Sequence, residues 1–577
     1  MNTPRGVRAV LAGLLVSLVA AACAGHAAVS SDAEADLTSP TAVPAAEPAE
    51  QAGADATSAA TTAIPTPRRA SGGRIVYGIE ADTLNAWTPQ NAAAAISGHM
   101  VMRSVYDLLA YPDTDGEVRG MLLDGIAPND DASSWTLTVR PGITFHDGTP
   151  LDAAAVADNL RRHRSSLLTG AIIASVTDVR TLDDMTVVVD LDGPSPAFPV
   201  LLTTLVGYVA SPTWLAAVDA GTASPAEPVG TGPFVFASYE PGVSFVATRN
   251  PNYWQAGQPA VDEIEFRIIS STTERTESIR SGATTIIHTD RADEIVRFRE
   301  QLDRFGVVET AEHGETRYLM LNQTDPSAPT ADVRVRRAMA MALDRDLYRA
   351  ARAGGLYDIA SGPFPPGTTG YLADTGFPTH DPDAAAALVA EVEAERGPIV
   401  VRWPVGDDEF SLISAELISA MWADAGIDVE LVPVPQDQLI FRALTGDFDV
   451  LFWRNHAGFD PLLQYHWWHS TTASDPPDLS VNFSRIRDPI IDENLDLLRR
   501  SADPDERRAA AEAINRRFGE QVYDIWLTWP VWAIVHDPLI HGIVGEATLP
   551  DGTLALPTGV GIGGTHLLSQ LWIEEPS

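Results

Sequence analysis

A short segment late in the chain combines residue types that bind small polar ligands. It runs from Trp453 through Arg454, Asn455 and His456 to Asp460, and it follows an apolar stretch that predicts a buried strand. Trp453 offers a flat apolar wall, and the Arg454 guanidinium can hold a carboxylate or phosphate through two hydrogen bonds. Asn455 and His456 can orient further polar groups. We predict that this segment contacts a ligand; the alternative is a solvated loop around a core tryptophan.

Two histidines three residues apart, His466 and His469, suggest a metal site on one helical face. The intervening Trp467 and Trp468 favour packing instead, and no third ligand is evident in the sequence. A multi-thiolate site is excluded because the chain has a single cysteine, Cys23. We therefore predict neither a metal site nor a cofactor, although nickel as an ion or chelate stays open as a solute.

The motifs of common enzyme classes are missing. The chain contains no lysine, which excludes a P-loop lysine, a Schiff-base lysine and a Ser-x-x-Lys pair. It also has no His-Glu-x-x-His and no Gly-x-Ser-x-Gly sequence. The glycine-rich stretch 559–564 lacks the strand before it and the helix after it that a dinucleotide site requires. We predict a binding protein that is not an enzyme.

The charge balance narrows the class of partner. The chain has 39 basic and 78 acidic residues among 577, a formal net charge of -39. A nucleic-acid partner is excluded because a duplex binder needs a basic face, and a polybasic contact with anionic lipid is excluded for the same reason. The acidity says little about the solute itself.

The N-terminus has the pattern of an export signal. Arg5 and Arg8 precede an almost wholly apolar run over 10–22, which is too short to span a bilayer comfortably. The run ends in small residues directly before Cys23, and this end resembles the lipobox of bacterial lipoproteins, with Ala20 where leucine is usual. The resemblance implies cleavage after residue 22 and lipidation of Cys23. The alternative is an ordinary secreted protein whose cysteine is incidental.

Residues 23–70 are rich in Ala, Thr, Ser, Pro and Glu and show no sustained apolar period. This composition predicts a disordered tether between the lipid anchor and a folded part. No other transmembrane candidate is evident, so we expect an extracytoplasmic protein anchored to a bacterial cell membrane.

The folded part mixes strand and helix patterns, which predicts an α/β protein. Alternating or buried apolar patterns predict strands over 74–79, 135–140, 143–145, 186–191, 427–432 and 449–453. Helical spacing and capping residues predict helices over 152–162, from about 332 to 343, over 383–393 and over 410–424.

An ordered series of motifs resembles the extracytoplasmic solute-binding proteins of family 5, which bind peptides, oligopeptides or nickel for ABC importers. The motifs lie at 72–85, 135–151, 230–234, 249–254, 333–345 and 446–450. The resemblance runs from about residue 72 to about residue 530. Most of these residues are expected to be structural, so they identify the family and do not locate the ligand.

The resemblance implies a two-lobed, periplasmic-binding-protein-like fold with a hinge. The expected N-terminal lobe spans 71–315 with an extra subdomain at about 111–229, and 535–577 return to it. The C-terminal lobe spans 316–534. A small solute, peptide-like first of all, is expected in the cleft between the lobes, and permease subunits of the importer are the expected partners. A solute-sensing lipoprotein, or an importer component for a metal chelate or sugar, stays open.

The resemblance also bears on the ligand site. Peptide-binding members carry an aspartate shortly before the Asp-Pro pair, where it holds the peptide ammonium, and the corresponding residue here is Ala457. Glu80, Asp82 and Asp460 are the candidate acids to replace it. The loop after the first strand faces the cleft in the family, which makes Trp87 a second candidate wall.

Overall fold

The computed structural model describes residues 68–70, 72–83, 87–92, 96–310, 314–456, 458–543, 547–556 and 565–575. The predictions on the signal peptide, Cys23, the tether up to residue 67, Ala457 and the glycine-rich stretch 559–564 lie outside these residues. Within the described ranges, no helix has both the length and the apolar character needed to cross a membrane.

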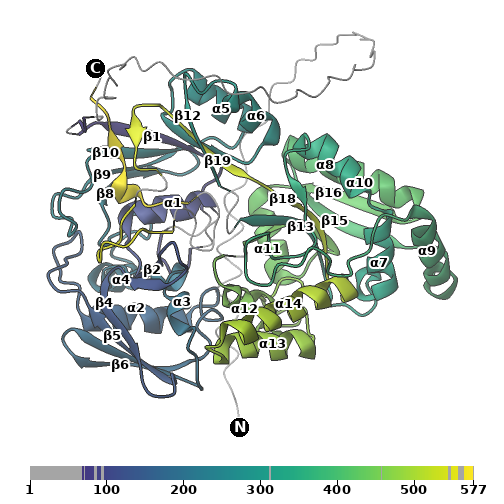
Figure 1. Ribbon diagram of the computed structural model, residues 1–577, viewed down its shortest axis with the longest axis horizontal. Coiled ribbons are helices and arrows are strands. Elements are labelled where there is room, and N and C mark those ends of the chain that lie inside the picture. Colours follow the sequence, from purple (N-terminus) through teal and green to yellow (C-terminus); the bar gives the residue numbers. More distant parts are fainter. Residues whose placement is uncertain are drawn as a thin grey trace, which may run out of the picture. The chain divides into compact units, whose positions relative to one another are not determined.

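The largest sheet joins strands from three distant parts of the chain (Figure 1). Its central strand β1 pairs in parallel with β10 and β11, and the late strand β19 lies antiparallel between β11 and β12. We call the part of the chain built on this sheet the first lobe. In sheet order the strands are β12 (Gly306–Thr310), β19 (Trp532–His536), β11 (Ile286–Thr289), β1 (Arg74–Ile79), β10 (Glu263–Ile268), β9 (Ser244–Arg249) and β8 (Phe234–Glu240).

A second sheet, which is antiparallel, is formed by residues 123–191 and has its own hydrophobic core. Its strands in order are β4 (Leu123–Pro128), β5 (Ser134–Val139), β7 (Thr186–Leu191) and β6 (Val176–Asp183). Two small pairs complete the strands of this lobe, β2 (Ala110–Pro112) with β3 (Val118–Gly120), and β20 (Ile540–His541) with β21 (Trp572–Ile573). Its helices are α1 (Ile96–Val105), α2 (Ala153–Ser165), α3 (Phe198–Leu201), α4 (Pro212–Asp219), α5 (Thr272–Arg280) and α6 (Ala292–Arg299).

The chain enters a third sheet after β12 and leaves it before β19, so two crossings join this part, the second lobe, to the first. The sheet order is β14 (Asp358–Ile359), β18 (Asp524–Trp529), β13 (Glu315–Leu321) and β17 (Val450–His456). A parallel pair, β15 (Val400–Gly406) and β16 (Asp428–Val434), lies beside it. The helices are α7 (Val333–Ala342), α8 (Arg345–Ala353), α9 (Pro382–Arg396), α10 (Glu409–Asp424), α11 (Gln436–Thr445), α12 (Tyr465–Trp468), α13 (Pro489–Arg500) and α14 (Pro504–Gln521).

Aspartates are the N-cap residues of many of these helices, so part of the acidic composition stabilises helix starts. An aspartate oxygen accepts a backbone N–H in the first turn and places a negative charge at the positive end of the helix dipole. Asp152 and Asp332 start the helices that the sequence predicted from them, α2 and α7. The same arrangement occurs at Asp344, Asp381, Asp408, Asp488 and Asp503.

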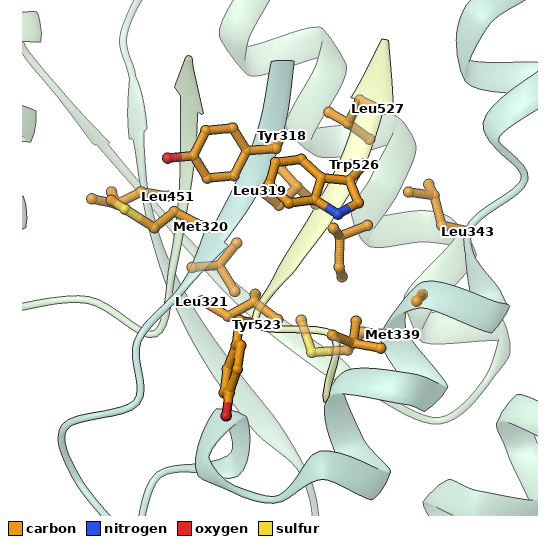
Figure 2. Packing of buried hydrophobic residues seen from close by; sticks show 14 of the residues in the cluster. Tyr318, Leu319, Met320, Leu321, Met339, Leu343, Leu451, Tyr523, Trp526 and Leu527 are labelled. Carbon is orange, nitrogen blue, oxygen red and sulfur yellow. The ribbon is translucent and has the colours of Figure 1, made fainter. Parts of the chain in front are cut away.

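The core of the second lobe is formed where α7 packs on the β13–β18 sheet (Figure 2). Strand β13 is buried along its whole length, and Tyr318 packs against Trp526 of β18 with ring centroids 5.2 Å apart. Met339 and Leu343 come from the predicted amphipathic helix and its C-cap and are fully buried in this core. Burial of such side chains contributes about 1.5–3 kcal/mol each.

The signature motifs gather at one buried carboxylate in the first lobe, Asp107. Tyr253 OH and Trp254 Nε1 each donate to it at 2.9 Å, and Thr231 Oγ1 donates at 3.1 Å. Gly232 lies so close to the end of α1 that a Cβ there would meet the Val105 carbonyl carbon at 2.4 Å. The glycine is therefore required by a close approach, and these motif residues act as scaffold.

Most of the predicted elements are confirmed. Strands form over 74–79, 134–139, 186–191 and 428–434, and helices α2, α7, α9 and α10 cover the predicted helical segments. The short strand predicted over 143–145 is wrong, because only Thr144 forms a single bridge, to Pro150. The strand predicted to end at Trp453 is β17, which continues to His456.

Candidate functional site

The predicted ligand segment is a strand rather than a loop that follows one. Residues Trp453 to His456 belong to β17 and pair with β13 residue by residue, ending with His456 opposite Glu315. A strand positions these side chains alternately on the two faces of the sheet. The segment is therefore held rigidly by the second lobe.

A small cavity lies against this strand, and its described lining residues all belong to the second lobe. All four residues from Trp453 to His456 border it, and Trp453 packs edge-on against Phe483 with ring centroids 5.3 Å apart. The other described lining residues come from β13, from α12 and from the loop before α13: Tyr318, Met320, Trp467, Trp468, Phe483 and Ser484. The walls are thus mostly aromatic, with a few polar groups, as in small-molecule sites.

Arg454 contacts carboxylates of the protein itself. Its Nη1 lies 3.3 Å from Glu80 Oε1, its Nη2 lies 3.7 Å from Asp290 Oδ2, and its Nε lies 3.6 Å from Glu315 Oε1. Glu80 and Asp290 follow β1 and β11 of the first lobe, whereas Arg454 belongs to the second lobe. The guanidinium predicted to hold a ligand anion is therefore part of an ion-pair network between the lobes.

A second buried arginine completes this network. Arg317 of β13 pairs directly with Asp290, and its Nε lies 3.5 Å from Glu315 Oε1. Arg317 and Glu315 are 3% and 0% exposed, and Trp532 Nε1 donates to Glu315 Oε2 at 3.2 Å. We refer to Glu80, Asp290, Glu315, Arg317 and Arg454 as the interlobe charge network.

Two carboxyl groups of this network have opposite pKa shifts. Burial alone would raise the pKa of Glu80, but Arg454 and the other nearby cations lower it to about 2. Burial raises the pKa of Glu315 to about 7, against the opposing effect of Arg454. Glu80 is consequently ionised at neutral pH, whereas Glu315 is close to its titration midpoint.

The remaining polar residues of the segment differ in their partners. Asn455 is buried, and its Nδ2 donates to the Pro363 carbonyl at 3.4 Å. His456 Nδ1 has no hydrogen-bond partner, and its backbone carbonyl accepts from Gln464 Nε2 at 2.7 Å. Burial and the charge of Arg454 lower the pKa of His456 to about 4, so its ring is neutral at pH 7.

Three other predicted site residues are bound to the protein and are absent from the cavity lining. Asp460 caps the short helix after it and pairs through both oxygens with Arg507, at 2.7 and 2.6 Å. Asp82 accepts from Tyr239 OH at 2.8 Å and from a backbone N–H at 2.8 Å. Trp87 is 2% exposed and belongs to the core of the first lobe.

The two histidines around the tryptophan pair have separate surroundings. His466 packs on Trp467, and burial lowers its pKa to about 3. His469 stacks on Tyr465, and its Nε2 is 3.8 Å from Asp496 Oδ1. In the described part of the chain, no group of three or more His, Cys, Asp or Glu side chains is placed to hold a metal.

Comparison with known proteins decides the family. The model for bacterial extracellular solute-binding proteins, family 5 Middle, matches residues 117–476, more than half of the chain. The chain belongs to this family. Family 5 proteins bind solutes outside the cytoplasm, and the chain is accordingly a two-lobed solute-binding protein and not an enzyme.

Relatives within and around family 5 differ in ligand. The chain is 26% identical over 481 residues to "Probable di/tripeptide-binding protein 5" of Pseudomonas aeruginosa, covering 78% of this chain and 87% of that protein. The periplasmic binding protein DppA of Helicobacter pylori, in complex with the peptide STSA, superposes with a TM-score of 0.77 at 20% identity, over 88% of this chain and 99% of DppA. The binding protein AgaA of A. tumefaciens R10, in complex with agropinic acid, gives 0.75 at 23% identity over the same shares.

Proposed function

We propose that this chain is an extracytoplasmic solute-binding lipoprotein that captures a peptide or peptide-like solute between its lobes. It then delivers the solute to the permease subunits of an ABC-type importer. The observation that carries the proposal is the aromatic cavity beside β17, bordered by the arginine that contacts the other lobe. Ligand bound there touches the element that carries the interlobe charge network, so binding and lobe closure become linked.

The relatives support a peptide-like solute in particular. One is named for di- and tripeptides and another holds a bound peptide, while a third holds agropinic acid. A cavity that combines Trp453 and Phe483 with Asn455 and His456 has the wall chemistry for such a solute.

Native mass spectrometry of the purified protein, before and after denaturation, tests the proposal. We expect a bound solute, or a mixture of peptide-like masses, to be released on denaturation. When the protein is first stripped, added solute should raise its melting temperature, because ligand that binds only the folded state stabilises it. Repeated chemical turnover of any candidate would overturn the proposal. No release, together with no thermal shift from peptides, nickel chelates or sugars, would favour a sensing role through a protein partner.

Membrane attachment through Cys23 is a separate part of the proposal. The single cysteine follows an apolar run that ends in small residues, the arrangement of a lipoprotein signal. The full chain, expressed in a bacterium with a radiolabelled fatty acid, should carry the label and sediment with membranes. Cys23→Ser should lose both properties. Equal labelling of the two proteins would contradict lipidation at this residue.

A further inference from the structure

The chemical class of the solute follows from the charges around the cavity, and this inference rests on the proposed function. Of the described residues that line the cavity, Arg454 is the one with a formal charge at pH 7, and no carboxylate lines it. A positively charged amine placed there would have no opposite charge within the lining. Such a group would lose its hydration without compensation, which is costly.

The acids that sequence reasoning offered as substitutes are already engaged. Glu80 pairs with Arg454, and its low pKa reflects that pairing. Asp82 accepts a tyrosine hydroxyl and backbone N–H groups, and both oxygens of Asp460 pair with Arg507. The negative charge of each of these acids is thus already partly balanced by the protein, and none of the three lines the cavity.

The nearest acid behind the lining is also unsuitable. Ser484 borders the cavity, and its hydroxyl lies 3.4 Å from Asp524 Oδ1. Asp524 is 1% exposed, and burial raises its pKa well above the ordinary value. Asp524 therefore lies behind the lining, shielded by Ser484, and its raised pKa makes it a weaker counter-charge than an exposed carboxylate.

The lining residues other than Arg454 suit an aromatic or amide part of a ligand that carries no positive charge. Trp453, Trp467 and Phe483 form aromatic walls, and Trp467 and Phe483 have ring centroids 5.2 Å apart. His456 borders the cavity, and its buried Nδ1 has no hydrogen-bond partner within the protein, so an amide of the solute is the partner that the proposal assigns to it. An aromatic side chain next to an acylated nitrogen fits both features.

We propose that the cavity selects peptide-like solutes with an aromatic group and a blocked amino end, and discriminates against a free ammonium. N-acetyl-Phe-Ala and Phe-Ala are a matched pair of probes that differ in this one charge. With the stripped protein, calorimetric titration at pH 7 should show at least roughly tenfold tighter binding of the acetylated probe, since an unpaired buried charge costs more than 1.4 kcal/mol. Equal affinity, tighter binding of Phe-Ala, or no binding of either probe would overturn the proposal.

A negative charge introduced into the cavity should reverse the preference for the acetylated probe over Phe-Ala. His456→Asp supplies the missing carboxylate, and His456→Asn removes the imidazole without adding charge. We expect Phe-Ala to bind more tightly than its acetylated form only in the Asp variant. A reversal that also occurs in the Asn variant would contradict the charge argument. If native mass spectrometry instead releases peptides with free amino ends, this inference is wrong while the proposed function still holds.

Discussion

Arg317→Met should lower the free energy of unfolding by about 3–5 kcal/mol, because it removes the cation that pairs directly with the buried Asp290. Arg317 is 3% exposed and pairs with Asp290 and Glu315, which are 5% and 0% exposed. Methionine keeps most of the apolar stem of the arginine side chain. The loss of stability therefore reflects the missing charge more than the missing side-chain volume. Urea unfolding at pH 7 measures the change.

Arg299 provides the matched control for this substitution. It also pairs with a glutamate, Glu309, but its side chain is 44% exposed. Exposed ion pairs contribute about 0–1 kcal/mol, so Arg299→Met should change stability by no more than that. Adding Asp290→Asn to Arg317→Met should recover part of the loss, because it removes the acid whose direct partner was Arg317. Equal effects of the two single arginine substitutions would show that the interlobe charge network does not stabilise the fold.

The network also explains a limit of sequence reasoning. Glu315 and Arg317 precede Tyr318 to Leu321 in one fully buried strand, yet the sequence analysis did not single them out. Charged residues at the start of an apolar strand were the available signal. Asp290, the partner of Arg317, follows a strand of the other lobe, and no local pattern in the sequence predicts that encounter.

Local signals, in contrast, predicted local structure well. The apolar run of β7 and the aspartates that start α2 and α7 depend only on neighbouring residues, so the sequence alone was enough to predict them. The Asp-Pro pair at Asp460 was also a local signal, because aspartate caps a helix whose first residue is proline. Its interpretation as a ligand contact did not anticipate Arg507, which α14 brings from a distant part of the chain.

The end of β17 also shows the difference between what local patterns predict and what contacts with distant strands determine. An apolar run predicts a strand up to Trp453, where the polar residues begin. The structure extends the strand to His456 because β13 supplies a partner for each residue, up to the Glu315–His456 pair. Pairing between distant strands thus overrides the local change in polarity. The residue types of the segment suggested a ligand site, whereas their placement in a paired strand was not predictable from the sequence.

Glu315→Gln should remove a specific part of the pH dependence of stability. The pKa of Glu315 is about 7 in the folded protein, against an ordinary value of 4.5. Between these two values the unfolded chain loses this proton and the folded chain keeps it. The folded state is therefore penalised progressively as the pH rises from about 4.5 to about 7, and the full penalty persists above pH 7. A shift of this size corresponds to roughly 3 kcal/mol.

The measurement is the free energy of unfolding in urea at pH 5, 6, 7 and 8, for the wild-type protein and the variant. Glutamine keeps the shape and the acceptor for Trp532 Nε1, and it cannot titrate. The wild-type protein should lose roughly 2–3 kcal/mol more than Glu315→Gln between pH 5 and pH 8. Parallel profiles over this range would show that Glu315 is ionised in the folded protein throughout.

Asp107→Asn separates the pH dependence that arises from Glu315 from that of another buried acid. Burial raises the pKa of Asp107 from 3.8 to about 6, so its contribution changes between about pH 4 and pH 6. Its replacement should flatten the profile below pH 6 and leave the slope between pH 6 and pH 8 unchanged. Glu315→Gln should flatten that upper range, because its folded pKa is higher. Since Glu315 contacts Arg454, which also reaches the first lobe at Glu80, the upper slope reports the charge state of the interlobe charge network itself.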